Sequence, residues 1–317
     1  MTKYTIKRLL QSVFTVLLVV TIVFLLLRLM PTDYFFTEDE LIKLSDAQKQ
    51  DRLLAAGLLD HPLVQLGRFY TKLFTKLDLG LSRRVQTNKP VVDLIASKFA
   101  ISMRLGLFAL GISLVIGVIF GVLQARNKDG ILDHIGTAYT VFVNAVPSLV
   151  SYSLILVFGA RLLGLPSLYS VRKPGPSAVL PIICLSIGSI AGYMLWTRRY
   201  MVDELNKDYI RLAKLKGLST RSVMFRHVLR NAFVPLAQYL PYSILLTVGG
   251  SLLVERFFSV PGMGPLLTDA INRYDTNVVQ GIVMLYASLG IVGVFLGDIL
   301  MTLIDPRIRL INKGETR

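Results

Sequence analysis

The sequence RRYMVDELNKDYIRLAKLKGLSTRSVMFRHVLRNAF, residues 198–233, is the longest polar interval between apolar segments in the C-terminal two-thirds of the chain. It carries nine Lys or Arg residues against three acidic residues. Tyr209, Leu212 and Ala213 recur at helical spacing, and Gly217 is placed to end that helix as a C-cap. A helix followed by glycine, between hydrophobic segments, indicates a docking surface. A solvated basic loop is the alternative interpretation.

A second short helix is predicted after this glycine. Either Ser219 or Thr220 is suited to cap its N-terminus, because a side-chain oxygen there accepts from the first free backbone N–H groups. Its apolar side is predicted to consist of Val223, Phe225, Val228 and Leu229. The polar interval therefore reads as two short helices separated by a turn.

Composition places the chain in a membrane. Of its 317 residues, 53% are hydrophobic and 17% are charged, whereas soluble domains average about 25% charged residues. The formal net charge of +15 would suit nucleic acid, but membrane topology explains where the basic residues lie. The single cysteine, Cys184, excludes an intrachain disulfide and a cysteine-based metal site.

Six segments are long and apolar enough to cross a bilayer, which takes roughly 20 residues. They are Leu9–Met30, Leu105–Leu123, Ala138–Ala160, Ala178–Thr197, Val234–Val254 and Val278–Leu303. The second contains Gly117 and Gly121 among its small residues, which favour close helix packing. The sequence thus predicts an all-α polytopic membrane protein with six transmembrane helices.

The first two spans are separated by a polar insert, residues 31–98. Its stretches 37–59 and 63–77 have amphipathic helical patterns. The insert is either a small extracytoplasmic subdomain or a set of helices lying at the membrane interface. The remaining divisions are 1–30 for the N-terminus and first span, 99–304 for a five-helix core that includes 198–233, and 305–317 for a tail.

Basic residues set the orientation. The polar stretches on the N-terminal side of the membrane hold eighteen Lys or Arg, and the two short links on the other side hold five. Because cytoplasmic loops are enriched in these residues, both termini and the 198–233 stretch are predicted to be cytoplasmic in a cell membrane.

No motif for catalysis is apparent in the sequence. The chain lacks the Gly-x-x-x-x-Gly-Lys-Ser/Thr phosphate loop, and His61, His134 and His227 are scattered rather than set at metal-ligand spacing. We therefore expect no catalytic residue, no metal site and no cofactor in this chain. A docking loop in a chain that lacks an ATP-binding motif favours a pore subunit whose energy comes from ATP hydrolysis by another protein.

Among the polar residues inside the predicted spans are Asn144, Gln238 and Asp298. Intramembrane polar groups are costly and often functional, so they are candidates for the translocation path. The alternative is that Asn144 and Gln238 join helices through hydrogen bonds. Pro147 and the pair Pro235 and Pro241 are predicted to bend their helices.

Five motifs in order along nearly the whole chain resemble the membrane subunits of ABC-type importers, in the branch that carries dipeptides, oligopeptides and nickel. Within that branch, the long insert resembles the first, B-type, pore subunit. The motifs are GLLDHPLVQ (57–65) with DLGLS (78–82), DYIRLAKLKG (208–217), HxxRNA (227–232) followed by Pro235, ERFFSVPGMG (255–264) and DPRI (305–308).

The resemblance implies a type I importer fold and a role in peptide uptake. It implies that the helix ending near Gly217 docks on a cytoplasmic ATPase through Asp208, Tyr209, Arg211, Leu212, Ala213, Lys214 and Gly217. In the wider family this helix opens Glu-Ala-Ala, where this chain has Arg211, Leu212 and Ala213. Pro261, Gly262, Met263 and Gly264 are expected to form a tight turn before a helix over 265–274 that contacts a binding protein. A plain re-entrant turn is the alternative.

The implied assembly has several partners. They are a second, related permease, two ATPases that hold ATP and Mg²⁺, an extracytoplasmic binding protein and membrane lipid, without nucleic acid. The cargo implied is peptide, with nickel or a metal chelate as the alternative within the branch. A stand-alone channel or secondary carrier is the alternative from a different class of protein.

Overall fold

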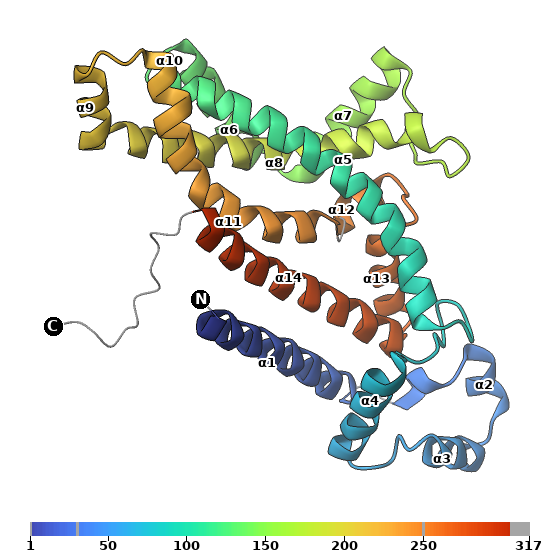
Figure 1. The fold of residues 1–317 in the computed structure, drawn as a ribbon. Coiled ribbons are helices and arrows are strands. Elements are labelled where there is room, and N and C mark those ends of the chain that lie inside the picture. The colour runs from blue at the N-terminus through green and yellow to red at the C-terminus, as the bar shows by residue number, and fades with distance from the viewer. Residues whose placement is uncertain (1, 30–31, 249–250, 305–317) are drawn as a thin grey trace. The chain divides into compact units, whose positions relative to one another are not determined.

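The computed structural model describes residues 2–29, 32–248 and 251–304, and within them every regular element is helical (Figure 1). In these ranges, β-type backbone pairing occurs as an isolated antiparallel bridge between Leu81 and Pro90. The elements before the core are α1 (Thr2–Leu27), η1 (Thr32–Phe35), α2 (Glu38–Lys43), α3 (Asp46–Ala55) and α4 (Pro62–Lys76). The all-α prediction is confirmed.

The rest of the chain forms longer helices joined by short links. They are α5 (Val91–Arg126), α6 (Ile131–Ala145), α7 (Ser148–Leu163), α8 (Pro174–Leu205), α9 (Asp208–Leu215), α10 (Thr220–Ser222), the π-helix η2 (Val223–Val228), α11 (Leu229–Val248), α12 (Leu252–Phe257), α13 (Met263–Asn272) and α14 (Thr276–Ile304).

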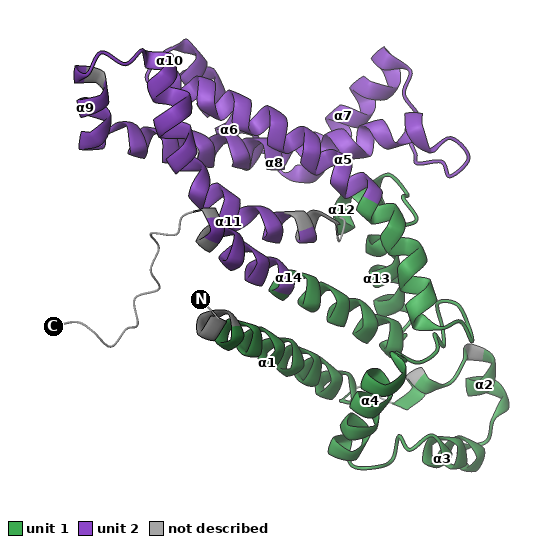
Figure 2. Ribbon diagram, viewed as in Figure 1, with its two compact units in different colours: residues 1–103, 249–291 green, residues 104–248, 292–317 purple. Residues whose placement is uncertain are grey.

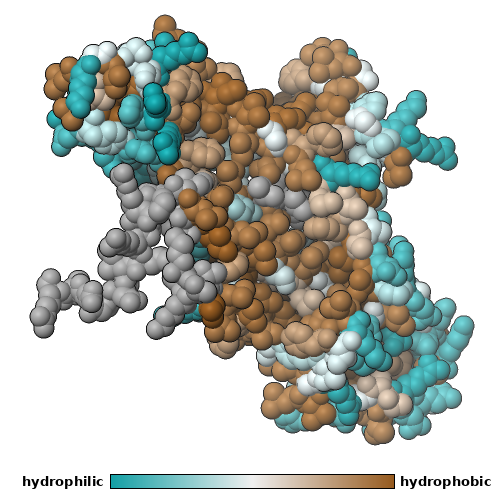
Figure 3. Space-filling view, viewed as in Figure 1, coloured by the Kyte–Doolittle hydropathy of each residue, from teal (hydrophilic) through white to brown (hydrophobic). Residues whose placement is uncertain are grey.

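Four of these helices are long and apolar enough to cross a membrane, namely α1, α5, α8 and α14. They correspond to the first, second, fourth and sixth predicted spans. Met30, the last residue predicted for the first span, lies outside the described residues. Apolar side chains cover much of the face in view over these helices (Figure 3). The chain is a multi-pass membrane protein.

The third predicted span differs from the straight helix expected over 138–160. It is divided into α6 and α7, which are bent by 109° at the break. Pro147 causes the break because it has no N–H to donate and because it disfavours helical backbone in the residue before it. Val146 has accordingly left the helix, with ψ 128°. The predicted bend at Pro147 is therefore a full break.

The fifth predicted span corresponds to α11, which begins five residues earlier than expected. It continues from η2 without a turn and contains Pro235 and Pro241 in its interior. It is not among the helices that meet the length and hydropathy requirement for a span. Residues 249–250 of the predicted segment lie outside the described residues.

The two stretches of the insert that were predicted to be helical contain three α-helices, α2, α3 and α4, rather than two. The stretch 37–59 is divided because Thr37 and Ser45 each form a capping box, which starts a new helix at each position. The second stretch forms α4 as expected. Tyr70 on α4 fixes it to α1: its hydroxyl donates to the carbonyl of Leu17 at 2.9 Å and lies 2.7 Å from the hydroxyl of Thr21.

The described chain divides into two compact units (Figure 2). Unit 1 comprises residues 1–103 and 249–291, and unit 2 comprises 104–248 and 292–317. This division follows contacts and does not test the sequence-based division into insert, core and tail. The tail 305–317, with the DPRI motif, lies outside the described residues.

Unit 1 is held together by Asp275, which joins the insert to the start of α14. Its Oδ2 accepts from the hydroxyl of Ser82 at 2.6 Å and from the backbone N–H groups of Arg83, Arg84 and Val85 at 2.9–3.0 Å. The Asp275 side chain is 1% exposed. Four donors on one buried oxygen tie the insert to the start of α14.

In unit 2, helices α5 and α8 approach closely at glycines. A Cβ atom on Gly117 would lie 2.6 Å from the Cβ of Tyr193, and one on Gly121 would lie 2.6 Å from the Cβ of Thr197. Any larger residue would push the helices apart. The prediction of small-residue packing is confirmed for these two glycines, whereas Gly111 faces open space.

Helices α6 and α8 are joined by a buried ion pair. Nε and Nη2 of Arg198 donate to the two oxygens of Asp133 at 2.5 and 2.6 Å. The Asp133 carboxylate also accepts from the backbone N–H of Asp129 at 3.0 Å. Its side chain is 4% exposed, whereas that of Arg198 is 26% exposed. The bidentate geometry fixes the two helices in register.

We expect Asp133→Ala to destabilise unit 2. Removing one partner leaves the other charge uncompensated, and the cost is on the order of 2–3 kcal/mol, because Arg198 retains partial access to solvent. A thermal unfolding measurement on the purified protein in detergent checks this result. Asp208→Ala, which removes a carboxylate that is 96% exposed and 3.6 Å from Arg211, is the matched control and is expected to change the unfolding temperature little. Equal effects of both changes would contradict the assigned role of Asp133.

Candidate coupling and translocation site

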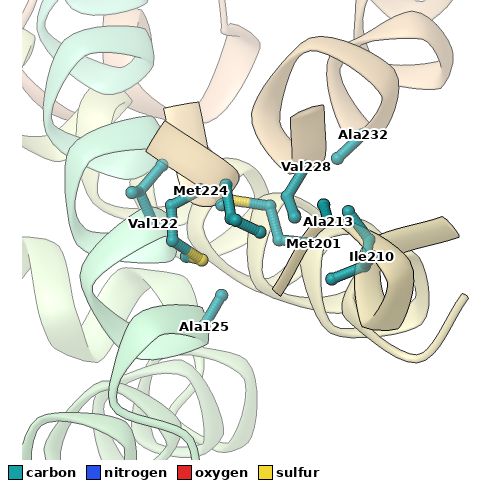
Figure 4. Close-up of a cluster of buried hydrophobic side chains, with 9 residues drawn as sticks. Val122, Ala125, Met201, Ile210, Ala213, Met224, Val228 and Ala232 are labelled. Atoms are coloured by element: carbon teal, nitrogen blue, oxygen red, sulfur yellow. The ribbon is translucent and has the colours of Figure 1, made fainter. Parts of the chain in front are cut away.

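Helix α9 has a buried inner face. Ile210 is 0% exposed and Ala213 is 8% exposed. Both belong to a hydrophobic cluster with Met201 of α8 and Val228 of η2, which we call the α9 cluster; its other members are Val122, Ala125, Val223, Met224 and Ala232 (Figure 4). The small side chain of Ala213 lets the backbone of α9 approach the cluster.

The opposite face of α9 is apolar and exposed. Leu212 is 53% exposed and Leu215 is 85% exposed, whereas Tyr209, at 37% exposure, lies at the edge of this face. Arg211 and Asp208 form an ion pair of 3.6 Å on the surface. The side chain of Lys214 lies outside the described part of the chain. An exposed leucine pair on a short basic helix is available for a partner.

Gly217 ends the helix as predicted. Its φ of +78° lies in the left-handed region, which costs an L-residue with a side chain roughly 1–2 kcal/mol. The N–H of Leu218 donates to the carbonyl of Ala213 at 3.3 Å, and the N–H of Lys216 donates to that of Leu212 at 3.0 Å. The first of these is the 6→1 bond of a Schellman cap, and the second is the last i→i−4 bond of the helix.

The predicted second short helix is wrong in length and in one residue. Ser219 caps it, accepting from the N–H of Ser222 at 3.3 Å, but the helix then runs through η2 into α11. Phe225, expected on the apolar side, is 55% exposed, and Met224 is buried in its place. In this helix the buried face follows Met224, Val228 and Ala232, and Phe225 lies outside it.

A hydrogen-bonded triad ties α9 to the two helices beside it. The hydroxyl of Tyr209 donates to the carboxylate of Glu204 on α8. The amide of Asn231 on α11 donates to the Tyr209 hydroxyl at 2.8 Å and to Glu204 at 3.1 Å. Burial and the Glu204 hydrogen bond raise the pKa of Tyr209 to about 12. The hydroxyl therefore remains a donor at physiological pH, and its contribution to stability is lost only as the pH rises from about 10 through 12.

Two of the three predicted path residues lie together. Gln238 of α11 and Asp298 of α14 line one groove of about 360 Å³, and Nε2 of Gln238 donates to Asp298 at 3.5 Å. Helices α11 and α14 approach each other closely at a glycine beside Tyr242: a Cβ atom on Gly293 would lie 2.8 Å from the Cα of Tyr242. A carboxylate and an amide thus face one opening within unit 2.

Sequence reasoning missed the aromatic walls of this groove. Tyr200, Tyr239 and Tyr242 line it with Pro235 and Val294. The i, i+3 spacing of Tyr239 and Tyr242, one residue beyond Gln238, is the signal that could have placed them on the same side as that amide.

Asn144 lies elsewhere in unit 2. It lines a separate cavity of about 360 Å³ at the break between α6 and α7, with Pro147 and Cys184. Its amide donates to the carbonyl of Thr140 at 2.8 Å, one turn earlier on the same helix. This hydrogen bond lies within α6 and gives no indication that Asn144 contacts a substrate.

The tight turn predicted over Pro261–Gly264 lies earlier in the chain, at Phe258 and Ser259. Helix α13 begins at Met263 rather than at 265, so Met263 and Gly264 belong to the helix. Met263 is 0% exposed, and its N–H donates to the hydroxyl of Ser102 at 2.9 Å. The N–H of Gly264 donates to Glu255 at 2.7 Å. Burial raises the pKa of this Glu255 carboxyl, and its hydrogen bonds with Ser102 and Gly264 oppose the shift. The exposed part of α13 is its far end, where Ile271 is 51% exposed.

Comparison with known proteins gives the context for these features. Residues 117–310 match the family model described as a binding-protein-dependent transport system inner membrane component. Along 99% of its length the chain is 32% identical to the whole dipeptide transport system permease protein DppB of Bacillus subtilis. It is 34% identical to the DppB protein of Lactococcus lactis and 32% identical to the oligopeptide transport system permease protein OppB of Haemophilus influenzae, in each case over 98% of this chain and the whole relative.

We expect Tyr209→Phe to loosen α9 without unfolding the protein. The change removes a hydrogen bond to a charged group, whose net contribution is about 1.5 kcal/mol. Amide hydrogen exchange in residues 208–215 should accelerate roughly tenfold, as measured by mass spectrometry. Tyr274→Phe removes the hydroxyl of a side chain that is 55% exposed and serves as the control. Unchanged exchange in α9 would show that the triad does not hold the helix.

Proposed function

Since the chain belongs to the family of binding-protein-dependent transport system inner membrane components, we propose that it forms one half of the pore of an ATP-driven peptide importer. The observation that carries the proposal is the division of α9 into a buried inner face and an exposed apolar outer face. A helix built in this way can receive a push from a partner and pass it to the membrane helices behind it.

Two sets of contacts could transmit a displacement of α9 to the membrane helices. The α9 cluster joins Ile210 and Ala213 to α5, α8 and η2 by close packing. The triad joins Tyr209 to Glu204 on α8 and to Asn231 on α11 by directed hydrogen bonds. A displacement of α9 would therefore move the cytoplasmic ends of α8 and α11 together, and the groove containing Gln238 would change shape with them.

The groove suits a peptide. The Asp298 carboxylate can pair with an ammonium group, the Gln238 amide can bond a peptide group, and Tyr200, Tyr239 and Tyr242 offer faces for side chains. The relatives are dipeptide and oligopeptide permeases by name, which favours peptide over the alternatives, nickel and metal chelates. The path role of Asn144 is a separate proposal, because this residue lines the cavity at the break between α6 and α7 rather than the groove.

The partners follow from this function. The chain would pair with a second permease, and two cytoplasmic ATPases would bind ATP and Mg²⁺ and supply the hydrolysis. An extracytoplasmic binding protein would deliver the cargo. Both termini and α9 would then lie in the cytoplasm, as the eighteen-to-five bias of basic residues supports. The exposed end of α13 is the proposed contact for the binding protein, whereas Gly262, Met263 and Gly264, which were candidates for this contact, are buried.

We expect Leu215→Glu to uncouple the assembled transporter. Leu215 is 85% exposed, so its replacement leaves the fold intact, but a charge in an apolar docking contact costs several kcal/mol. ATPase activity stimulated by loaded binding protein should fall at least tenfold in proteoliposomes. Gly217→Arg, which strains the left-handed turn, is expected to act in the same direction.

The control is Leu54→Glu, a leucine on α3 that is 69% exposed. It should leave stimulated turnover unchanged. If Leu215→Glu and Gly217→Arg also leave it unchanged in a complex that still assembles, 198–233 is only a basic connector. Transport by the chain purified alone, without ATP, would instead establish a secondary carrier.

Asp298→Asn is expected to slow transport more than ATP hydrolysis. Losing a charge-assisted contact with the peptide ammonium costs about 1.5 kcal/mol, which corresponds to roughly tenfold in transport rate. Uptake of labelled peptide and stimulated ATPase are measured on the same vesicles. Asp46→Asn, at an exposed ion pair with Lys49 on α3, is the control. Equal loss of uptake and hydrolysis in Asp298→Asn would assign Asp298 to assembly rather than to the path.

A further inference from the structure

Unit 1 contains a cleft of about 680 Å³ at the C-terminal end of α1. Its walls come from α1, α4, the turn at 55–58, the stretch 78–83 and the first residues of α14. This cleft has no part in the coupling helix or in the groove described above. The side chains that matter for its chemistry are Phe24, Gln65, Lys72, Arg83, Asp275 and Gln280.

Three buried polar atoms in the cleft walls have no hydrogen-bond partner in the described part of the chain. They are Oε1 of Gln65, Oδ1 of Asp275 and Nε2 of Gln280. The three side chains are 8%, 1% and 7% exposed. Unsatisfied buried polar groups cost about 1–3 kcal/mol each, and three of them around one cleft indicate that a polar ligand completes them.

Their chemical character is fixed by the bonds that the same groups already make. Nε2 of Gln65 donates to the carbonyls of Leu58 and Asp60 at 2.9 and 2.8 Å, so Oε1 is left as an acceptor. Asp275 uses Oδ2 to hold Ser82, so Oδ1 is also an acceptor. Gln280 offers an N–H donor. The ligand must therefore present at least two donors and one acceptor.

The cleft is also basic. Arg28, Arg68, Lys72 and Arg83 line it against Asp78 and Asp275. Arg68 is paired with Asp60 at 2.5 Å, whereas Lys72 has no carboxylate within ion-pair distance among the described residues. A ligand that carries a negative charge and hydroxyl groups satisfies both the charge and the hydrogen-bonding requirement.

The position along α1 identifies where such a ligand would come from. The apolar span of α1 is Ile6–Leu27, and Phe24 and Arg28, at its end, line the cleft. Only 11% of that span is buried inside the protein, so most of its surface, including Ile22 and Leu26 at 47% and 58% exposure, is available to acyl chains. A lipid lying along α1 has its headgroup at the level of the cleft.

We propose that this cleft binds the headgroup of an anionic phospholipid that carries hydroxyl groups, of which phosphatidylglycerol is the simplest. The phosphate faces Lys72 and the Gln280 amide. The glycerol hydroxyls donate to Oε1 of Gln65 and Oδ1 of Asp275. Phosphatidylcholine fits poorly because its headgroup has no donor and adds a positive charge. The site is independent of the cargo and of the direction of transport.

The test is lipid binding by the full chain, purified with the subunits that accompany it, delipidated and titrated in detergent by native mass spectrometry. Phosphatidylglycerol, phosphatidylethanolamine and phosphatidylcholine are compared. The expected result is at least fivefold tighter binding of phosphatidylglycerol than of the other two. Lys72→Gln should remove about fivefold of that affinity, the effect of about 1 kcal/mol for a Lys beside an anionic lipid. Lys76→Gln, one turn along the same helix and outside the cleft, should leave it unchanged.

Other results overturn the proposal. Equal binding of the three lipids by the wild-type protein excludes a headgroup site. This comparison does not depend on the folding of any variant. Equal losses in Lys72→Gln and Lys76→Gln show only general attraction to the basic surface. Displacement of the lipid by soluble glycerol phosphate at equal concentration indicates a site for a soluble anion, and displacement by a tripeptide assigns the cleft to the cargo. None of these readouts requires transport, so failure of the importer proposal would leave this result interpretable.

Discussion

A peptide group inside a bilayer has no water to bond, so each N–H and C=O must find its partner within the protein. This constraint makes the long apolar segments of the chain helical. A break in such a helix leaves backbone groups unpaired, so each break requires a specific cause. The chain breaks at Pro147, where α6 ends and α7 begins at 109°. It does not break at Pro181, Pro235 or Pro241, which remain within α8 and α11. Proline alone therefore does not decide where a membrane helix ends.

The extent to which the sequence predicted this structure depends on the range of the interactions involved. The end of α9 at Gly217 and the cap at Ser219 follow from residues within one or two turns. The first was predicted correctly, and Ser219 was one of the two candidates for the cap. The helices of the insert were predicted less well. The amphipathic pattern over 37–59 indicated one helix, but capping boxes at Thr37 and Ser45 start two separate helices there. Phe225 was assigned to the wrong face because the burial of Met224 depends on α5 and α8, which no local pattern reports.

Long-range contacts lay beyond prediction from one sequence. Ser82 and Asp275 are 193 residues apart and share one hydrogen bond at the centre of unit 1. Gln238 and Asp298, 60 residues apart, were each named as isolated polar residues, and the structure places them in one groove. The tyrosines around them were missed because an aromatic residue in a membrane helix is ordinary on its own. These residues can be assigned to one site only because the structure shows that they line the same groove.

The attachment of α9 combines two kinds of interaction with different consequences. Full burial of a side chain such as Ile210 contributes about 1.5–3 kcal/mol and has no preferred direction. The hydrogen bond from Tyr209 to Glu204 contributes about 1.5 kcal/mol, the lower end of that range, but it fixes the orientation of the helix relative to α8 and α11. The cluster therefore keeps α9 attached while the triad determines how it points. A partner that pushes on Leu212 and Leu215 would meet a helix that resists detachment more strongly than rotation, which is the mechanical property that a coupling element requires.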